Sequence, residues 1–114
     1  MMIELYAVEV FGYHGATDAE EREGQTFLID VSLWPRQEPA GDDIDQTIDY
    51  REVAACVREV SDRQRVRLLE TLASSLADEL VERFTLQRVR VRVRKPHVVL
   101  DPPAEYSAVT VERP

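Results

Sequence analysis

The feature that most constrains this sequence is a run near its C-terminal end in which valines and arginines alternate strictly. Val89, Val91 and Val93 stand at every second position, with arginines between and beside them. Because successive side chains of a β-strand point to opposite faces of the sheet, this run predicts a strand with one apolar and one basic face. The rest of the chain must cover the valines and accommodate the basic face, which carries Arg88, Arg90, Arg92 and Arg94.

Three other segments have strand-like content. Residues 3–11 and 26–34 are rich in apolar residues, and in the second segment these alternate with polar ones. Residues 96–103 interrupt the C-terminal pattern with prolines, and residues 106–112 then resume it. We therefore expect two strands in each half of the chain.

Two segments between these pairs of strands have the spacing of amphipathic helices. Asp49 and Glu52 have capping-box-like spacing at the start of the first, whose apolar residues recur at intervals of three to four. The second has a longer apolar stripe, with acidic residues left for the solvent side. The residues of this stripe are Leu69, Leu72, Ala73, Leu76, Leu80 and Phe84.

Helices grouped on one face of an antiparallel sheet give an α+β fold with the order β-β-α-α-β-β. The other face of this four-stranded sheet then has no cover within one chain. If several subunits joined at their sheet edges and closed into a barrel, exposed edges would disappear and the arginine face would turn inward. The sequence therefore favours an oligomeric barrel, without specifying its symmetry.

Composition limits the classes of function. The 114 residues suit one domain spanning residues 1–114, and the formal net charge of -8 gives no general attraction to nucleic acid or to anionic membranes. No apolar stretch is long enough to span a bilayer, and the N-terminus has no basic region followed by an apolar one. Cys56 is the only cysteine, so we expect a reducing, cytoplasmic location without disulfides.

Several residues could carry chemistry, but each also has an ordinary structural interpretation. Glu20 lies in a charged run that reads as a solvated loop, and Tyr50 precedes a helix where a capping or packing role is equally plausible. Glu70 lies near a helix start, where the helix dipole stabilises any carboxylate. Lys95 ends a strand. His14 could be a general base, but it has no acidic or nucleophilic neighbour at a recognisable spacing, which favours a structural role.

Other site types find little support. The sequence has no metal-ligand spacing of Cys, His and carboxylates, and no Gly-rich phosphate loop. The arginine-bearing strand could suggest RNA binding, but it has no interleaved aromatic residues on which bases would stack. We favour a structural interpretation, in which the arginines balance acidic residues such as Asp30 across strands or line an oligomeric barrel.

Taken together, the motifs resemble those of the dihydroneopterin aldolase family, over essentially the entire chain. The sequence contains, in the family's order, G-Y-H-G at residues 12–15, E-E-R-E-G-Q at 20–25, D-Q-T-I-D-Y at 45–50, L-L-E-T-L-A at 68–73 and R-V-R-V-R-K-P at 90–96. The resemblance implies the tunnelling fold, in which subunits join edge to edge in rings of four that usually stack into octamers. It also implies active sites between neighbouring subunits.

The resemblance assigns roles to residues at matching positions. Lys95 matches the catalytic lysine, and Tyr50 matches a tyrosine that approaches the site from the adjacent subunit. Glu70 matches the carboxylate that anchors the pterin ring, with Leu69 supplying backbone contacts. Glu20 matches the acid near the hydroxylated side chain of the substrate. Neither a cofactor nor a metal ion is implied.

The implied reaction is the retro-aldol cleavage of 7,8-dihydroneopterin into 6-hydroxymethyl-7,8-dihydropterin and glycolaldehyde, in tetrahydrofolate biosynthesis. A lysine can act as the base only if its pKa falls well below the usual value of about 10.4. Burial at an interface and the charge of Arg94 are expected to lower it, if the fold brings the two side chains close. Three alternatives remain open: a dihydroneopterin triphosphate epimerase, a pterin- or purine-binding oligomer without catalysis, and an RNA-binding sheet protein.

Overall fold

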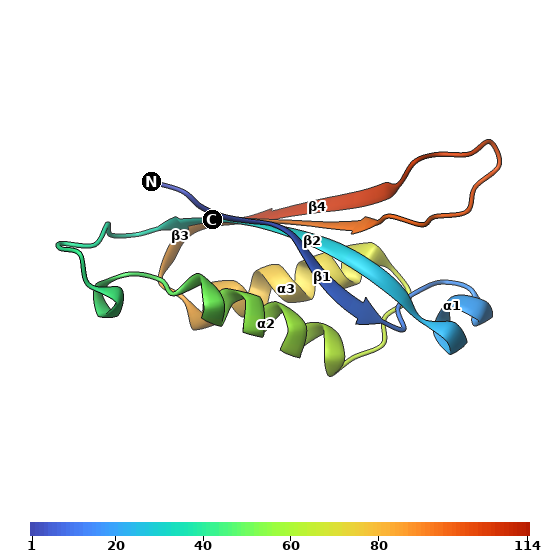
Figure 1. The fold of residues 1–114 in the computed structure, drawn as a ribbon, viewed down its shortest axis with the longest axis horizontal. Helices are drawn as coiled ribbons and strands as arrows, with labels where there is room; N and C mark the ends of the chain where they lie inside the picture. Colours follow the sequence, from blue (N-terminus) through green and yellow to red (C-terminus); the bar gives the residue numbers. More distant parts are fainter.

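A computed structural model describes all 114 residues. Its strands and helices follow the predicted order, with two short helices added (Figure 1). The elements are β1 (Ile3–Gly12), α1 (Asp18–Glu23), β2 (Gln25–Pro35), the 3-10 helix η1 (Ile44–Gln46), α2 (Tyr50–Asp62), α3 (Leu69–Arg83), β3 (Leu86–Lys95) and β4 (Ser107–Arg113).

The strands form one antiparallel sheet in the order β1-β2-β3-β4. Figure 1 shows α2 and α3 side by side beneath this sheet, with no element covering the opposite face. The predicted α+β architecture is therefore confirmed. The two outer strands, β1 and β4, each have one edge without a partner strand in the chain.

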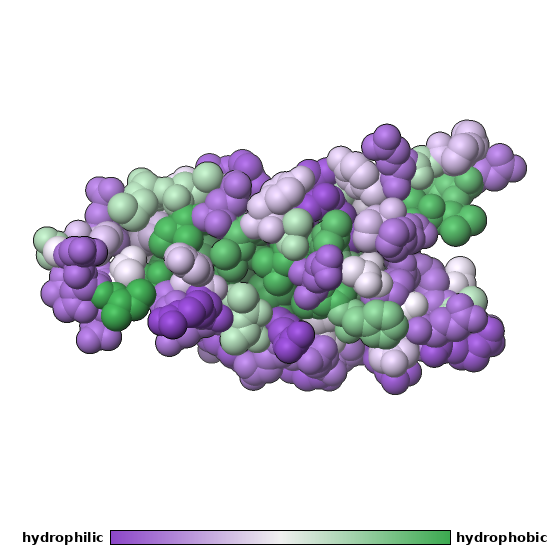
Figure 2. Space-filling view, viewed as in Figure 1, coloured by the Kyte–Doolittle hydropathy of each residue, from purple (hydrophilic) through white to green (hydrophobic).

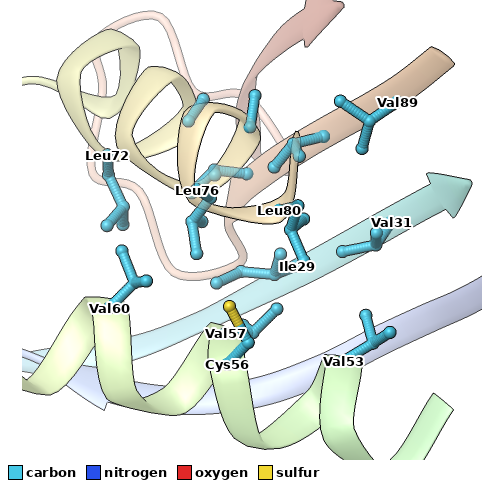
Figure 3. Close-up of a cluster of buried hydrophobic side chains, with 14 of the residues drawn as sticks. Ile29, Val31, Val53, Cys56, Val57, Val60, Leu72, Leu76, Leu80 and Val89 are labelled. Carbon is cyan, nitrogen blue, oxygen red and sulfur yellow. The ribbon is translucent and has the colours of Figure 1, made fainter. Parts of the chain in front are cut away.

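The core lies between the helices and the face of the sheet that carries the valines. Val89, Val91 and Val93 are fully buried, as their alternation predicts. Figure 3 shows the apolar residues of the two helices pointing toward those of β2 and β3. Burial of each large apolar side chain in this layer contributes about 1.5 to 3 kcal/mol to folding. The helix residues in the core include Val53, Val57, Val60, Leu72, Leu76 and Leu80.

The open face of the sheet carries the arginines in cross-strand ion pairs. Arg88 and Arg90 both contact Glu112 at 2.7 Å, and Arg94 contacts Asp30 at 2.9 Å. The Asp30 carboxylate also accepts the backbone N–H of Ala7, where β1 departs from regular pairing. The predicted charge balance across strands is therefore confirmed.

Aromatic side chains also lie against these arginines. The guanidinium carbon of Arg88 lies 4.7 Å from the centre of the Trp34 ring, and that of Arg92 lies 5.3 Å from the centre of the Tyr106 ring. The arginine strand itself has no interleaved aromatic residue, and its aromatic neighbours come instead from β2 and from the segment before β4. Their rings are engaged in cation–π contacts with the arginines.

The charged run after the first strand forms helix α1, whereas the sequence was interpreted as a loop there. Thr17 precedes this helix, and its side chain accepts the backbone N–H of Glu20 while the Glu20 side chain accepts that of Thr17. This reciprocal capping box stabilises a first helical turn without any buried residue. The helix therefore has no apolar stripe that periodicity could reveal.

Two apolar regions appear on the surface in Figure 2. One follows the middle of the view, where β1 and α2 lie in front, and the other lies over the loop between β3 and β4. In that loop Val99 is 93% exposed and Leu100 is 51% exposed.

None of the helices has the length and apolar character that crossing a membrane requires.

Candidate active site

The site forms where the end of β3 meets α1. The Nζ atom of Lys95 lies 2.6 Å from Oε2 of Glu20, and the two side chains are 15% and 24% exposed. The structure therefore brings together two residues that lie 75 positions apart in the sequence, both of which sequence analysis singled out.

Glu20 is held by a set of donors. Its Oε1 accepts from the backbone N–H and the hydroxyl of Thr17, and its Oε2 accepts from Gln25 at 2.9 Å as well as from Lys95. Burial alone would raise the pKa of this carboxyl. The hydrogen bonds from Lys95 and Gln25, the positive charge of Lys95 and the Thr17 N–H together outweigh burial and lower the pKa to about 2. Glu20 is therefore a carboxylate at any ordinary pH.

The two glycines of the G-Y-H-G motif leave room for this arrangement. A Cβ atom on Gly15 would lie 2.3 Å from Cβ of Glu20, and one on Gly12 would lie 2.7 Å from the ring of His14. Neither approach is sterically possible without a shift of the neighbouring side chain. The two glycines therefore allow the His14 ring to pack against Gly12 and the Glu20 side chain to pack against Gly15.

The His14 ring is buried, with 1% of the residue exposed, and both of its nitrogens have partners. Nε2 lies 2.9 Å from the Ser61 hydroxyl, and Nδ1 accepts the backbone N–H of Val66 at 3.2 Å. Burial lowers the pKa of this imidazole, opposed by the charge of Asp62. The arrangement agrees with the structural role that the sequence favoured.

A depression of about 480 Å³ lies beside the Glu20–Lys95 pair. Polar groups of Thr17, Gln25 and His97 line it on one side, and the loop after β3 contributes an apolar wall at residues 98–100. A partly apolar depression with a few polar groups is the usual form of a small-molecule site. A depression of about 530 Å³ at the opposite end of the sheet is lined by Arg88, Glu112 and Arg113, whose charges already pair.

Arg94 does not act on Lys95 as the sequence analysis expected. Successive residues of β3 point to opposite faces, so Arg94 lies on the open face of the sheet while Lys95 lies beside α1. Arg94 is also paired with Asp30. The charged partner of the lysine is instead the carboxylate of Glu20, at 2.6 Å.

Leu69 and Glu70 form the first turn of α3, close to the start of α1. The backbone N–H of Gly15 donates to the Val66 carbonyl at 2.9 Å, and Arg67 donates to the carbonyl of Ala16. Glu70 is exposed, and neither it nor Leu69 lines the depression beside Lys95. No side chain caps the start of this helix. Its first N–H groups are therefore available to an outside acceptor.

Tyr50 is the first residue of α2 and is 59% exposed. The residue before it, Asp49, lines a hollow with Pro35 and Thr85, at the start of β3. Lys95 ends the same strand, whose 10 residues extend about 30 Å. Figure 1 shows the start of α2 and the end of β3 toward opposite ends of the molecule. One chain therefore does not bring Tyr50 to Lys95.

Two contributors to the site had no role in the sequence analysis. Gln25 uses both hydrogens of its amide, one on Glu20 and one on the His14 carbonyl. Thr17 caps α1 and orients Glu20. The Thr17–Glu20 spacing is that of a capping box, a signal that the sequence contained. The role of Gln25 depends on a long-range approach for which the sequence gives no signal.

The whole fold matches solved structures. The crystal structure of dihydroneopterin aldolase from E. coli in complex with neopterin superimposes with a TM-score of 0.90 at 26% identity, covering 100% of this chain and 99% of that one. A putative dihydroneopterin aldolase from Vibrio cholerae gives 0.89 at 27% identity, covering 99% and 96%. Fold and site together define a tunnelling-fold protein.

Sequence comparison narrows this class. The family model for dihydroneopterin aldolase (FolB) matches residues 3–112. The dihydroneopterin aldolase of Bacillus subtilis is 34% identical over 115 aligned residues, which cover 96% of this chain and 92% of that protein. The chain belongs to the dihydroneopterin aldolase family.

Proposed function

We propose that the protein is a lyase that cleaves 7,8-dihydroneopterin into 6-hydroxymethyl-7,8-dihydropterin and glycolaldehyde, a step of tetrahydrofolate biosynthesis. The observation that carries this proposal is the Glu20–Lys95 pair beside an open depression, in a chain of the dihydroneopterin aldolase family. The relatives from Bacillus subtilis and Streptomyces coelicolor, each 34% identical, carry the same activity in their names.

The reaction is a cleavage whose atoms and electrons all come from the substrate. A base removes the proton of the second side-chain hydroxyl, the bond between the first and second side-chain carbons breaks, and glycolaldehyde leaves. The released electron pair enters the imine of the pterin ring and forms an enamine, which a proton on the first side-chain carbon converts to product. The ring acts as electron sink, so the protein must position the substrate and move a proton.

We assign the transfer of this proton to Lys95. In the chain itself Lys95 pairs with the carboxylate of Glu20, so the proposal requires the substrate to engage Glu20 before Lys95 can accept a proton. Substrate hydroxyls that donate to the Glu20 carboxylate would replace the lysine as its partner. Glu20 then orients the side chain of the substrate, and Lys95 accepts the proton and returns it to carbon.

Glu70 and Leu69 are assigned to ring recognition. The E. coli relative was crystallised with neopterin, and a relative from Burkholderia thailendensis was crystallised with guanine. Pterins and guanine share an amino group beside a ring N–H, two parallel donors that suit a carboxylate such as that of Glu70. The uncapped first turn of α3, where Leu69 lies, offers backbone N–H groups to the ring carbonyl.

Tyr50 is assigned to the site of a neighbouring subunit, where it would donate a proton at the carbon being rebuilt. Tyr50 is exposed and lies toward the end of the molecule opposite Lys95, and both observations support this assignment. The outer edges of β1 and β4 offer unpaired backbone groups for edge-to-edge joining, and the open arginine face would then line the interior. We propose a homo-oligomer of ring tetramers or stacked octamers, which light scattering or native mass spectrometry would identify.

The deciding experiment is product analysis of the protein with 7,8-dihydroneopterin in the presence of a chelator. We expect glycolaldehyde and 6-hydroxymethyl-7,8-dihydropterin in equal amounts, without added metal or cofactor. An epimer of the substrate as the main product would make the protein an epimerase. Binding of neopterin without any turnover across the pH range would instead identify a non-catalytic binding protein.

A further inference from the structure

The buried residue His14 connects the two parts of the proposed site, through its backbone carbonyl on one side and its ring on the other. We propose that His14 is a positioning residue: a neutral ring with its proton on Nε2 that holds the Glu20–Lys95 pair and the start of α3 in one fixed arrangement. This inference rests on the proposed function, and it adds a residue that the reaction itself does not use.

One arm runs from His14 to the acid–base pair. The His14 carbonyl accepts a hydrogen from the Gln25 amide at 3.3 Å, and the same amide donates its other hydrogen to Oε2 of Glu20 at 2.9 Å. That oxygen also accepts from Lys95. The position of His14 therefore bears on the orientation of Glu20 through one intervening side chain.

The other arm runs from His14 to the segment that enters α3. Val66 donates its backbone N–H to Nδ1 of the ring, and its carbonyl accepts the backbone N–H of Gly15. Val66 lies three residues before Leu69, the first residue of α3. These two hydrogen bonds of Val66, one with His14 and one with Gly15, fix the start of the helix that we assign to ring recognition.

The hydrogen-bond partners define the protonation state of the ring. A backbone N–H can only donate, so Nδ1 must be the unprotonated nitrogen. Nε2 then carries the hydrogen and donates to the Ser61 hydroxyl at 2.9 Å. A protonated ring would place an N–H of Nδ1 against the N–H of Val66. Protonation would therefore break the connection to α3.

The surroundings of the ring favour this neutral state. The Phe27 ring of β2 packs against it with centroids 5.3 Å apart, Ser61 of α2 presents a hydroxyl, and the loop before α3 presents a backbone N–H. The charge that acts on it is that of Asp62, and burial outweighs this carboxylate and lowers the pKa of His14. The neutral ring is therefore retained to a lower pH than in a free histidine.

A matched pair of substitutions separates positioning from bulk packing. In His14→Asn the amide oxygen can replace Nδ1 as acceptor for Val66, whereas in His14→Gln the amide nitrogen can replace Nε2 as donor to Ser61. We expect both variants to lower Tm. We expect His14→Gln to lose about tenfold or more in kcat/KM and in neopterin affinity, and His14→Asn to lose clearly less, because only Asn keeps the bond to the α3 segment.

Two further measurements test the protonation state of the His14 ring. Nitrogen-15 NMR of the imidazole should show the Nε2–H tautomer at pH 7, with neutral signals persisting below pH 6.5. The pH profile of kcat/KM should contain an acid limb that His14→Asn removes.

A charged ring or an Nδ1–H tautomer at pH 7 would overturn the inference, as would equal losses of kcat/KM and neopterin affinity in both variants. Absence of turnover by the unaltered protein, with the tautomer and the affinity difference as expected, would overturn the proposed function alone.

Discussion

The two ends of this molecule differ in how they hold their candidate site residues. At the end formed by α1 and the close of β3, Lys95 and Glu20 are partly buried, paired at 2.6 Å and supported by Gln25 and Thr17. At the end where α2 begins, Tyr50 is 59% exposed and makes no side-chain hydrogen bond. One end is preorganised within the chain, whereas the other presents an exposed side chain without a partner in the same chain.

This contrast supports the proposal that the fold builds one part of the site and that assembly with a second subunit completes the other. Substitutions at the Lys95 end should affect both chemistry and the local fold, because its side chains have partners in the same chain. Substitutions at the Tyr50 end should affect chemistry alone.

Replacing Lys95 should have the largest effect. Lys95 is the only lysine in the sequence, so Lys95→Met removes the one ammonium group that side chains provide. We expect kcat to fall by about 10² to 10⁴, the usual contribution of a general acid–base group, with a smaller change in neopterin affinity. Single-turnover kinetics and calorimetry would measure the two quantities. Retention of more than a tenth of the wild-type kcat would contradict the assignment.

Replacing Glu70 should weaken binding more than catalysis. Glu70→Gln keeps the size of the side chain but can no longer accept both donors of the ring, so the Kd for neopterin should rise by about 10- to 100-fold. Glu82→Gln on the same helix is a matched control, since Glu82 is exposed in the last turn of α3. An unchanged Kd in Glu70→Gln would remove Glu70 from ring recognition.

Replacing Tyr50 tests the end that assembly completes. Tyr50→Phe should lower kcat by about tenfold or more through loss of a proton donor, yet leave stability within about 0.5 kcal/mol because the hydroxyl is exposed. Thermal unfolding and steady-state kinetics on one preparation would compare the two effects. A large fall in Tm without any kinetic change would reverse the proposed contrast between the ends.

The Glu20–Lys95 pair should also give the Lys95 end a pH-dependent stability. The pKa of Glu20 is about 2 in the folded chain and 4.5 without the fold, so the folded state holds this proton less tightly. The stabilisation is therefore present above pH 4.5 and is lost as the pH falls toward 2. We expect about 1 to 2 kcal/mol, since solvent screens a partly exposed pair.

Urea unfolding from pH 6 down to the acid limit of reversible folding measures this contribution. The Glu20→Gln variant should be less stable at pH 6 and should approach the wild type as the pH falls. Parallel curves for the two proteins would mean that the ion pair contributes nothing to stability.

The sequence predicted the parts of the fold that local periodicity encodes. The alternation of Val89, Val91 and Val93 with arginines revealed both faces of the sheet, and the apolar stripe of α3 revealed the covering helix. It did not reveal α1, because this helix of six residues buries no side chain and is stabilised by its cap. Periodicity detects burial, so an element without burial escapes it.

The site was less accessible to sequence reasoning, because its geometry depends on approaches between distant residues. The motifs of the family pointed to Glu20 and Lys95, but the sequence could not indicate that they form a direct ion pair. The influence expected of Arg94 on Lys95 required the two side chains to lie close together. Strand alternation places Arg94 on the other face of the sheet. The double hydrogen bond of Gln25 likewise requires the folded arrangement of β2, α1 and the segment at His14.

Subunit complementation would show whether Lys95 of one subunit and Tyr50 of its neighbour complete one site, as we propose. Lys95→Met and Tyr50→Ala subunits, each with little activity alone, are mixed in equal amounts, unfolded and reassembled. If each site joins two subunits, random assembly should restore about a quarter of the wild-type activity, since that share of the sites receives both intact residues. Mixtures no more active than the average of the separate variants would contradict the account.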